Sequence, residues 1–270
     1  MLQQILTPPE FEQVTALTQT QPFIKSVWTL YEESRRQRAI LTQHIDIDAL
    51  LGRKGLALGQ VCEIVGQPGA GQTELCLRLC LSVQISEERG GVGLNAVYID
   101  TSGTFTYSGA KLALQRLQFQ LGEDATIVND QVAERINVFR VHCAQELIAL
   151  MYQFEKVCES IGNVGLLVVN SISWPFLVSA PENMVQRQFL QAEVARMLSE
   201  IAEKHQVAVV VVSQAKAPSE NAIGRTMDGD VWGRISSTRI ALSRTSDGHT
   251  VELLGSSMYP TGVAQILGEL

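Results

Sequence analysis

The segment with the clearest chemistry in this chain is residues 66–73, which read GQPGAGQT. The pattern G-x-x-x-x-G-K-[ST] is typical of a P-loop, whose backbone N–H groups surround phosphates at the N-terminus of a helix. Gln72 stands where that pattern has lysine, the ammonium that reaches the β- and γ-phosphates. The sequence therefore predicts that the phosphate cradle and the Thr73 hydroxyl, a candidate Mg²⁺ ligand, are kept, while the charge that assists phosphoryl transfer is lost.

Apolar segments flank residues 66–73 in the order that a P-loop requires. Residues 60–65 form a short apolar run typical of a buried strand, and residues 74–83 carry helix-forming residues with apolar positions on more than one face. This order of strand, glycine loop and helix favours a phosphate site over a glycine-rich turn that only looks like one. Weak binding of ATP or ADP with Mg²⁺ and an empty loop kept for its fold remain equally open.

The rest of the chain alternates strand and helix signals, which implies right-handed crossovers and a mostly parallel sheet. The sequence predicts an α/β fold with a twisted sheet, helices on both faces and a C-terminal β-hairpin on the sheet edge. The predicted strands are residues 96–100, 136–139, 165–170, 207–212, 238–244 and 250–255, and the predicted helices are residues 109–121, 144–161 and 184–205.

Composition and charge narrow the class of protein. The chain has 270 residues, a net charge of −7 and five cysteines without CxxC spacing, which indicates one large domain with reduced thiols and no zinc. No apolar stretch approaches the roughly 20 residues that span a bilayer, so we expect a soluble, intracellular protein that does not bind membranes. The acidic balance argues against tight binding of DNA by this chain alone.

Several sequence blocks occur in an order that resembles a known family. They read GLALGQ at 55–60, the P-loop, VYIDTSGTF at 97–105, VNSI at 169–172 with WPF at 174–176, VVVSQ at 210–214, and WG at 232–233 with STR at 237–239. Over about residues 41–267 the chain resembles the RecA-like recombinases of eukaryotes, the Rad-fifty-one family. It is most similar to the auxiliary paralogues, especially the C-type paralogue. The resemblance implies a RecA-like P-loop NTPase core.

The resemblance also implies a site that has lost its charges. The family's phosphate lysine falls on Gln72, its Mg²⁺-linked aspartate on Asn170, and the glutamate that polarises the attacking water on Ser102. Each such loss commonly costs about 10²–10³ in rate, so we expect no catalytic residue. The Gln214 position senses the γ-phosphate in the family. The expected contacts of a weak or absent ATP or ADP are Gly66, Gln67, Pro68, Gly69, Ala70, Gly71, Gln72, Thr73 and Gln214.

Two stretches correspond to the family's DNA-binding loops, about residues 178–187 and 215–230. Their basic residues, and the expected DNA contacts, are Arg187, Lys216 and Arg225. Acidic side chains outnumber them there, so we expect feeble, salt-sensitive DNA binding that improves within a complex.

The N-terminal part departs from the family pattern. About forty residues precede the core, so the expected organisation is an N-terminal segment at 1–41 that contains a linker helix over residues 28–37, no helical DNA-binding domain, and a RecA-like core at 42–270. Phe23 resembles the aromatic anchor of the family's subunit-docking pattern, although a phenylalanine packed on its own core is an equally good interpretation.

The favoured function is a scaffold or mediator subunit with little or no ATP hydrolysis, acting in homologous recombination and double-strand break repair, with meiosis among its settings. We expect a nuclear protein whose partners are other RecA-like paralogues, the recombinase filament and, within a complex, DNA. The alternative is an active DNA-dependent ATPase of the RecA family. A RecA-like regulatory ATPase outside recombination fits the fold but not residues 174–176 and 238–239.

Overall fold

The computed structural model describes residues 26–28, 32, 37–121, 134–180, 182–215 and 231–267. The chain divides into two compact units, Met1–Gln37 and Arg38–Leu270. Phe23 and most of the helix predicted over residues 28–37 lie outside the described residues. The elements below belong to the second unit.

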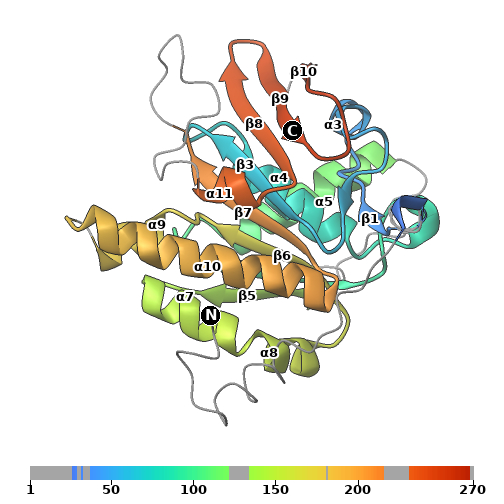
Figure 1. Cartoon of the computed structure of the whole chain (residues 1–270). Helices are drawn as coiled ribbons and strands as arrows, with labels where there is room; N and C mark the ends of the chain where they lie inside the picture. Colours follow the sequence, from blue (N-terminus) through green and yellow to red (C-terminus); the bar gives the residue numbers. More distant parts are fainter. Residues whose placement is uncertain are drawn as a thin grey trace. The chain divides into compact units, whose positions relative to one another are not determined.

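A sheet of eight strands in the order β10-β9-β8-β3-β7-β6-β4-β5 forms the centre of this unit (Figure 1). The six strands from β8 to β5 run parallel, and β9 and β10 are antiparallel to their neighbours. The predicted α/β class with a mostly parallel sheet is confirmed. The strands are β3 (Val61–Gly66), β4 (Asn95–Asp100), β5 (Ile136–Arg140), β6 (Val164–Asn170), β7 (Ala208–Gln214), β8 (Thr238–Thr245), β9 (Gly248–Ser256) and β10 (Gly262–Leu267).

Alternation along the strands divides the apolar side chains between the two faces of the sheet. On β6, Leu166 and Val168 belong to one buried cluster, whereas Leu167 and Val169 belong to the other. Successive side chains of a strand point to opposite faces, so a continuous apolar run needs helices on both sides. The first cluster contains residues of α3 (Ile45–Leu50), α4 (Gln72–Ser82) and α5 (Tyr107–Leu121), and the second contains residues of α7 (Ala144–Tyr152), α8 (Phe154–Ile161), α9 (Trp174–Ser179), α10 (Met184–His205) and α11 (Val231–Ile235).

Two elements differ from the sequence prediction. The single helix predicted over residues 144–161 is two helices, α7 and α8, separated at Gln153. The break leaves Phe154, which is 1% exposed, as the one buried residue of α8. The predicted hairpin of β8 and β9 is present but does not end the sheet, because β10 pairs with the outer side of β9. A small antiparallel pair, β1 (Ala39–Ile40) with β2 (Leu56–Ala57), precedes the sheet.

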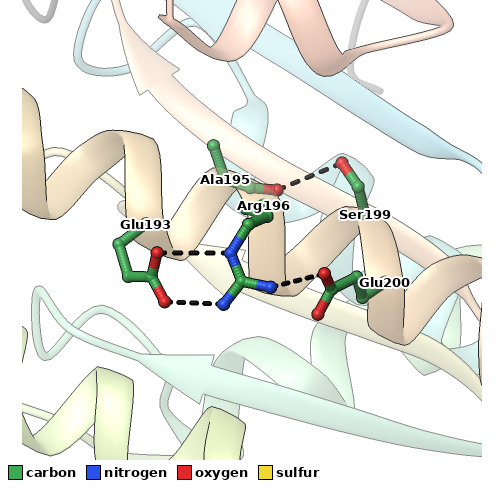
Figure 2. A network of polar contacts seen from close by, with 5 residues as sticks. All are labelled: Glu193, Ala195, Arg196, Ser199 and Glu200. Carbon is green, nitrogen blue, oxygen red and sulfur yellow. Dashed lines mark hydrogen bonds and ion pairs between the residues drawn. The ribbon is translucent and has the colours of Figure 1, made fainter. Parts of the chain in front are cut away.

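The long helix α10 matches its predicted bounds and has a buried face and an exposed face. Its buried residues include Val194, Leu198 and Ile201, which pack in the second cluster. On an exposed face, Arg196 lies between Glu193 and Glu200 and pairs with both (Figure 2). These surface pairs contribute little to stability, because the charges remain hydrated. Among the described residues, no helix is long and apolar enough to cross a membrane.

Candidate functional site

The P-loop lies at the carboxyl end of a central strand. Strand β3 ends at Gly66, between β7 and β8, and α4 begins at Gln72. Gly69 and Gly71 have φ angles of 83° and 96°, a region in which residues with a side chain are strained. The sheet, the glycine loop and the helix therefore have the arrangement that presents backbone N–H groups to an anion.

Gln72 folds back over the start of the loop. A methyl group built on Gly66 would lie 2.7 Å from Gln72 Nε2 and 2.9 Å from the carbonyl oxygen of Leu242. The side chain thus occupies the space that the absence of a Cβ atom at Gly66 leaves. Its amide can donate a hydrogen bond, but it carries no charge to compensate a phosphate.

Asn170 lies next to Thr73 and ties it to the sheet. The Asn170 Nδ2 group donates to Thr73 Oγ1 at 3.0 Å and to the Tyr98 hydroxyl at 2.8 Å. Asn170 is 4% exposed and Tyr98 is fully buried. Burial raises the pKa of Tyr98, so the phenol is protonated at neutral pH. The Thr73 hydroxyl is therefore held by a network of neutral groups.

Asp100 is a buried carboxylate at the same end of the sheet. It lies opposite Asn170 in the register of β4 and β6, and it is 1% exposed. Its Oδ1 accepts from the Thr104 N–H at 3.1 Å and its Oδ2 from the Phe105 N–H at 3.3 Å. These bonds fix the loop that follows β4. Ser102, in that loop, is exposed and places its hydroxyl 3.1 Å from Thr104 Oγ1, so it brings no charge to the site.

Two adjoining hollows of about 300 and 360 Å³ lie beside the loop and share Gly69, Gly71, Glu74 and Arg116 in their walls. Such volumes suit a small ligand. Arg116 forms an ion pair with Glu74. The turn between β8 and β9 lines one side of the larger hollow, and His249 Nδ1 lies 3.1 Å from the Ala70 carbonyl oxygen.

The sheet also brings Gln214 to the loop, because it is the partner of Gly66 where β7 pairs with β3. The following residue, Ala215, connects the ends of β7 and β3 by hydrogen bonds. The Ala215 N–H donates to the Gly66 carbonyl at 3.0 Å, and Gln67 Nε2 donates to the Ala215 carbonyl at 3.0 Å. Gln214 itself is exposed at this edge. Its role as a phosphate sensor stays a prediction.

The predicted DNA contacts are only partly within the described residues. Arg187 lies in the first turn of α10, and its N–H donates to the Asn183 carbonyl at 3.0 Å. Lys216 and Arg225 lie outside the described residues. Much of the stretch 178–187 is helical, since α9 ends at Ser179 and α10 begins at Met184. DNA binding by this stretch stays a prediction.

Residues that the sequence analysis did not single out complete the site. Tyr98, Arg116 and His249 contact it from β4, α5 and the start of β9, and each meets a partner at least 42 residues away in the chain. Tyr98 lies inside the block at 97–105, which offered one signal. For Arg116 and His249 the sequence offered none.

The site suits a phosphate group better than it suits Mg²⁺. Backbone donors of the loop and the N-terminus of α4 can hold an anion. Mg²⁺ prefers carboxylate and water oxygens, but Asn170 offers no charge and donates to Thr73. Within the described parts of the chain, no group of three or more His, Cys, Asp or Glu side chains could hold a metal ion.

Comparisons with known proteins give a consistent result. A family model described as Rad51 matches residues 35–260. The DNA repair protein RAD51 homolog 4 of Mus musculus is 32% identical over 251 residues, which are 88% of this chain and 73% of that protein. RAD51 homolog 3 of Cricetulus griseus is 29% identical over 228 residues, 78% of this chain. The chain spans 61% of the length of that hamster relative. The recombination protein RadA of Aeropyrum pernix is 29% identical over 226 residues, 82% of this chain and 68% of RadA.

Proposed function

Because the chain belongs to the Rad51 family, we propose that it is a non-hydrolysing subunit of a recombination complex. Its relatives are named as DNA repair and recombination proteins, which supports a role in those processes. In this proposal it acts in the nucleus, in homologous recombination and double-strand break repair, meiotic repair included. It assists the strand-exchange filament as a scaffold or mediator.

One observation carries the proposal: the Thr73 hydroxyl is bonded to a neutral amide at 3.0 Å, where hydrolysis needs ionic groups. Phosphoryl transfer in P-loop enzymes depends on a lysine, a metal ion held through a carboxylate, and a residue that orients the attacking water. Gln72, Asn170 and Ser102 supply none of these charges. Losing a single electrostatic stabiliser commonly costs about 10²–10³ in rate, or about 2.7–4 kcal/mol of barrier. The three neutral positions together favour a chain without useful turnover.

The surface of the second unit supports a role in protein association. Five apolar side chains on α9 and the first two turns of α10 are half or more exposed: Trp174, Val178, Met184, Val185 and Phe189. Exposed apolar side chains of this size commonly mark sites of protein association. Arg187 is the one basic residue in the 178–187 stretch, so nucleic acid has little charge to bind there. We therefore propose RecA-like chains as direct partners, with DNA bound mainly in the assembly.

Steady-state phosphate release tests the proposal. The purified chain is assayed with ATP and Mg²⁺, alone, with single-stranded DNA, and with a co-purified RecA-like partner. The matched control is Thr73→Val, which keeps the shape of the side chain and removes its hydroxyl. We expect the two proteins to release phosphate equally slowly, and the complex to turn over ATP equally well with either one.

Saturable phosphate release that the Thr73→Val variant loses would instead establish the alternative, an active DNA-dependent ATPase. Melting curves of both proteins are recorded in parallel, so that loss of folding is not mistaken for loss of turnover. Association is tested separately, by co-purification of the chain with the partner in the absence of nucleotide.

A further inference from the structure

The hydrogen bond between Asn170 and Thr73 changes what the Thr73 hydroxyl can offer a ligand. A hydroxyl has one proton to donate and two lone pairs that accept. Asn170 Nδ2 donates to Thr73 Oγ1 at 3.0 Å, so one of those lone pairs is used within the protein. The same amide donates to Tyr98 at 2.8 Å, which fixes its orientation from a second side. The hydroxyl proton of Thr73 is left to be donated.

The surroundings of Thr73 also disfavour a cation. The amide of Asn170 presents its N–H groups, the positive end of its dipole, to the place where a carboxylate would hold the metal shell. Asp100, the buried carboxylate that is the register partner of Asn170 on β4, already accepts from the Thr104 and Phe105 N–H groups. A divalent cation would therefore meet one remaining lone pair of Thr73 but no carboxylate charge beside it that repays its dehydration.

The loop keeps its capacity for an anion. The φ angles of Gly69 and Gly71 retain the P-loop turn, and α4, with 11 residues, begins directly after it. The first N–H groups of a helix have no partner within the helix, so the N-terminus of α4 attracts negative charge. The charged side chains in the walls of the two hollows are Glu74, Arg116, Arg244 and Asp247, two negative and two positive. Gln72 adds no positive charge to this balance, so an additional phosphate meets no net compensating charge.

We infer that Thr73 acts as a hydrogen-bond donor to phosphate and not as a metal ligand, so that the loop takes a nucleoside diphosphate without a divalent cation. The triphosphate binds more weakly, because it carries more negative charge and lacks both lysine and Mg²⁺ to neutralise it. The inference deepens the proposed function and rests on its premise that the site does not hydrolyse ATP.

Isothermal titration with ADP tests the inference on the full chain, once in excess Mg²⁺ and once in EDTA. We expect the affinity in Mg²⁺ to be no more than about twofold tighter than in EDTA, and ATP to bind more weakly than ADP in both. Any larger gain from Mg²⁺ overturns the inference. Absence of heat with millimolar ADP in both solutions overturns it as well, while the scaffold proposal stands.

Substitutions at Thr73 test its role as a donor. Thr73→Val should weaken ADP binding about tenfold, equally in Mg²⁺ and in EDTA, because a hydrogen bond to a charged group is lost. Thr73→Ser keeps the hydroxyl and should bind as the natural chain does. A loss confined to the Mg²⁺ solution would show that Thr73 is a metal ligand.

A change at Asn170 should restore dependence on the metal. Asn170→Asp returns a carboxylate to this end of β6 and should make ADP binding tighter in Mg²⁺ than in EDTA by about tenfold. The matched control is Asn163→Asp, which adds the same charge in the exposed turn at the opposite end of that strand. If Asn170→Asp binds ADP equally in both solutions, the neutral amide is not what excludes the cation. Phosphate release by the unsubstituted chain would instead contradict the proposed function.

Discussion

Replacing Tyr98 by phenylalanine should destabilise the protein although it removes a single oxygen atom. The Tyr98 hydroxyl accepts from Asn170 Nδ2 at 2.8 Å, and both residues are buried. The Tyr98→Phe variant would leave that N–H group in the core without this acceptor. A buried polar group that loses its partner commonly costs about 1–3 kcal/mol. We therefore expect the free energy of unfolding to fall by about 2 kcal/mol, which corresponds to a melting temperature lower by about 4–8 °C.

Urea denaturation followed by circular dichroism measures this difference. Tyr107→Phe is the matched control, because Tyr107 is 74% exposed and its hydroxyl is hydrated in both the folded and the unfolded chain. That variant should stay within about 0.5 kcal/mol of the unsubstituted protein. Combining Tyr98→Phe with Asn170→Ala should give a coupling energy of about 1 kcal/mol, because both changes remove the same bond.

The pH dependence of the Tyr98→Phe effect follows from the raised pKa of the phenol, which burial lifts above its ordinary value. The neutral phenol contributes its full stability below the pKa of the unfolded state, roughly 10, and loses it only as the pH rises through that value and beyond. The difference in the free energy of unfolding between the unsubstituted protein and the Tyr98→Phe variant should therefore be constant from about pH 6 to pH 9. Equal free energies of unfolding for the Tyr98→Phe and Tyr107→Phe variants, or a coupling energy of zero, would refute the hydrogen bond from Asn170 to Tyr98.

Two further changes test the packing around the site. The Trp232→Ala variant should have a free energy of unfolding lower by about 3–5 kcal/mol, because Trp232 is fully buried. The Trp174→Ala variant should change it little, because Trp174 is 51% exposed. Urea midpoints that fall equally in the two variants would contradict this. The Gly91→Ala variant should be destabilised by about 3 kcal/mol, because the added methyl group would lie 2.1 Å from the Ile85 carbonyl oxygen. The methyl group of the Gly255→Ala variant would meet nothing within 4 Å, so that variant should melt at a higher temperature than Gly91→Ala. Thermal melts in the opposite order would count against the described turn.

The sequence predicted the elements whose apolar pattern is long or continuous. Residues 165–170 and 184–205 were placed almost to the residue, because a buried parallel strand and an amphipathic helix have distinct periodicities. Strand β10 was missed, because its alternating pattern is short and Val263 is 63% exposed. The break at Gln153 was missed, because the apolar spacing of α7 continues into Phe154.

Only the site residues that stand at motif positions could be predicted from the sequence. Gln72 and Asn170 stand at motif positions, so their neutrality can be read from the sequence. The bond from Asn170 to Tyr98 joins residues 72 positions apart, and it depends on the pairing of β4 with β6. The contact of His249 with the loop depends in the same way on the hairpin. Such contacts come from tertiary packing, which local sequence patterns do not encode.

The contact between His249 and the Ala70 carbonyl has a practical consequence for following this protein in solution. His249 is the second residue of strand β9, and its partner on β10 is Ile266. Leu267, at the end of β10, is the register partner of Gly248, which lines the larger hollow. We therefore expect a fluorophore attached after residue 267 to report filling of that hollow, while every residue of the phosphate loop keeps its natural side chain.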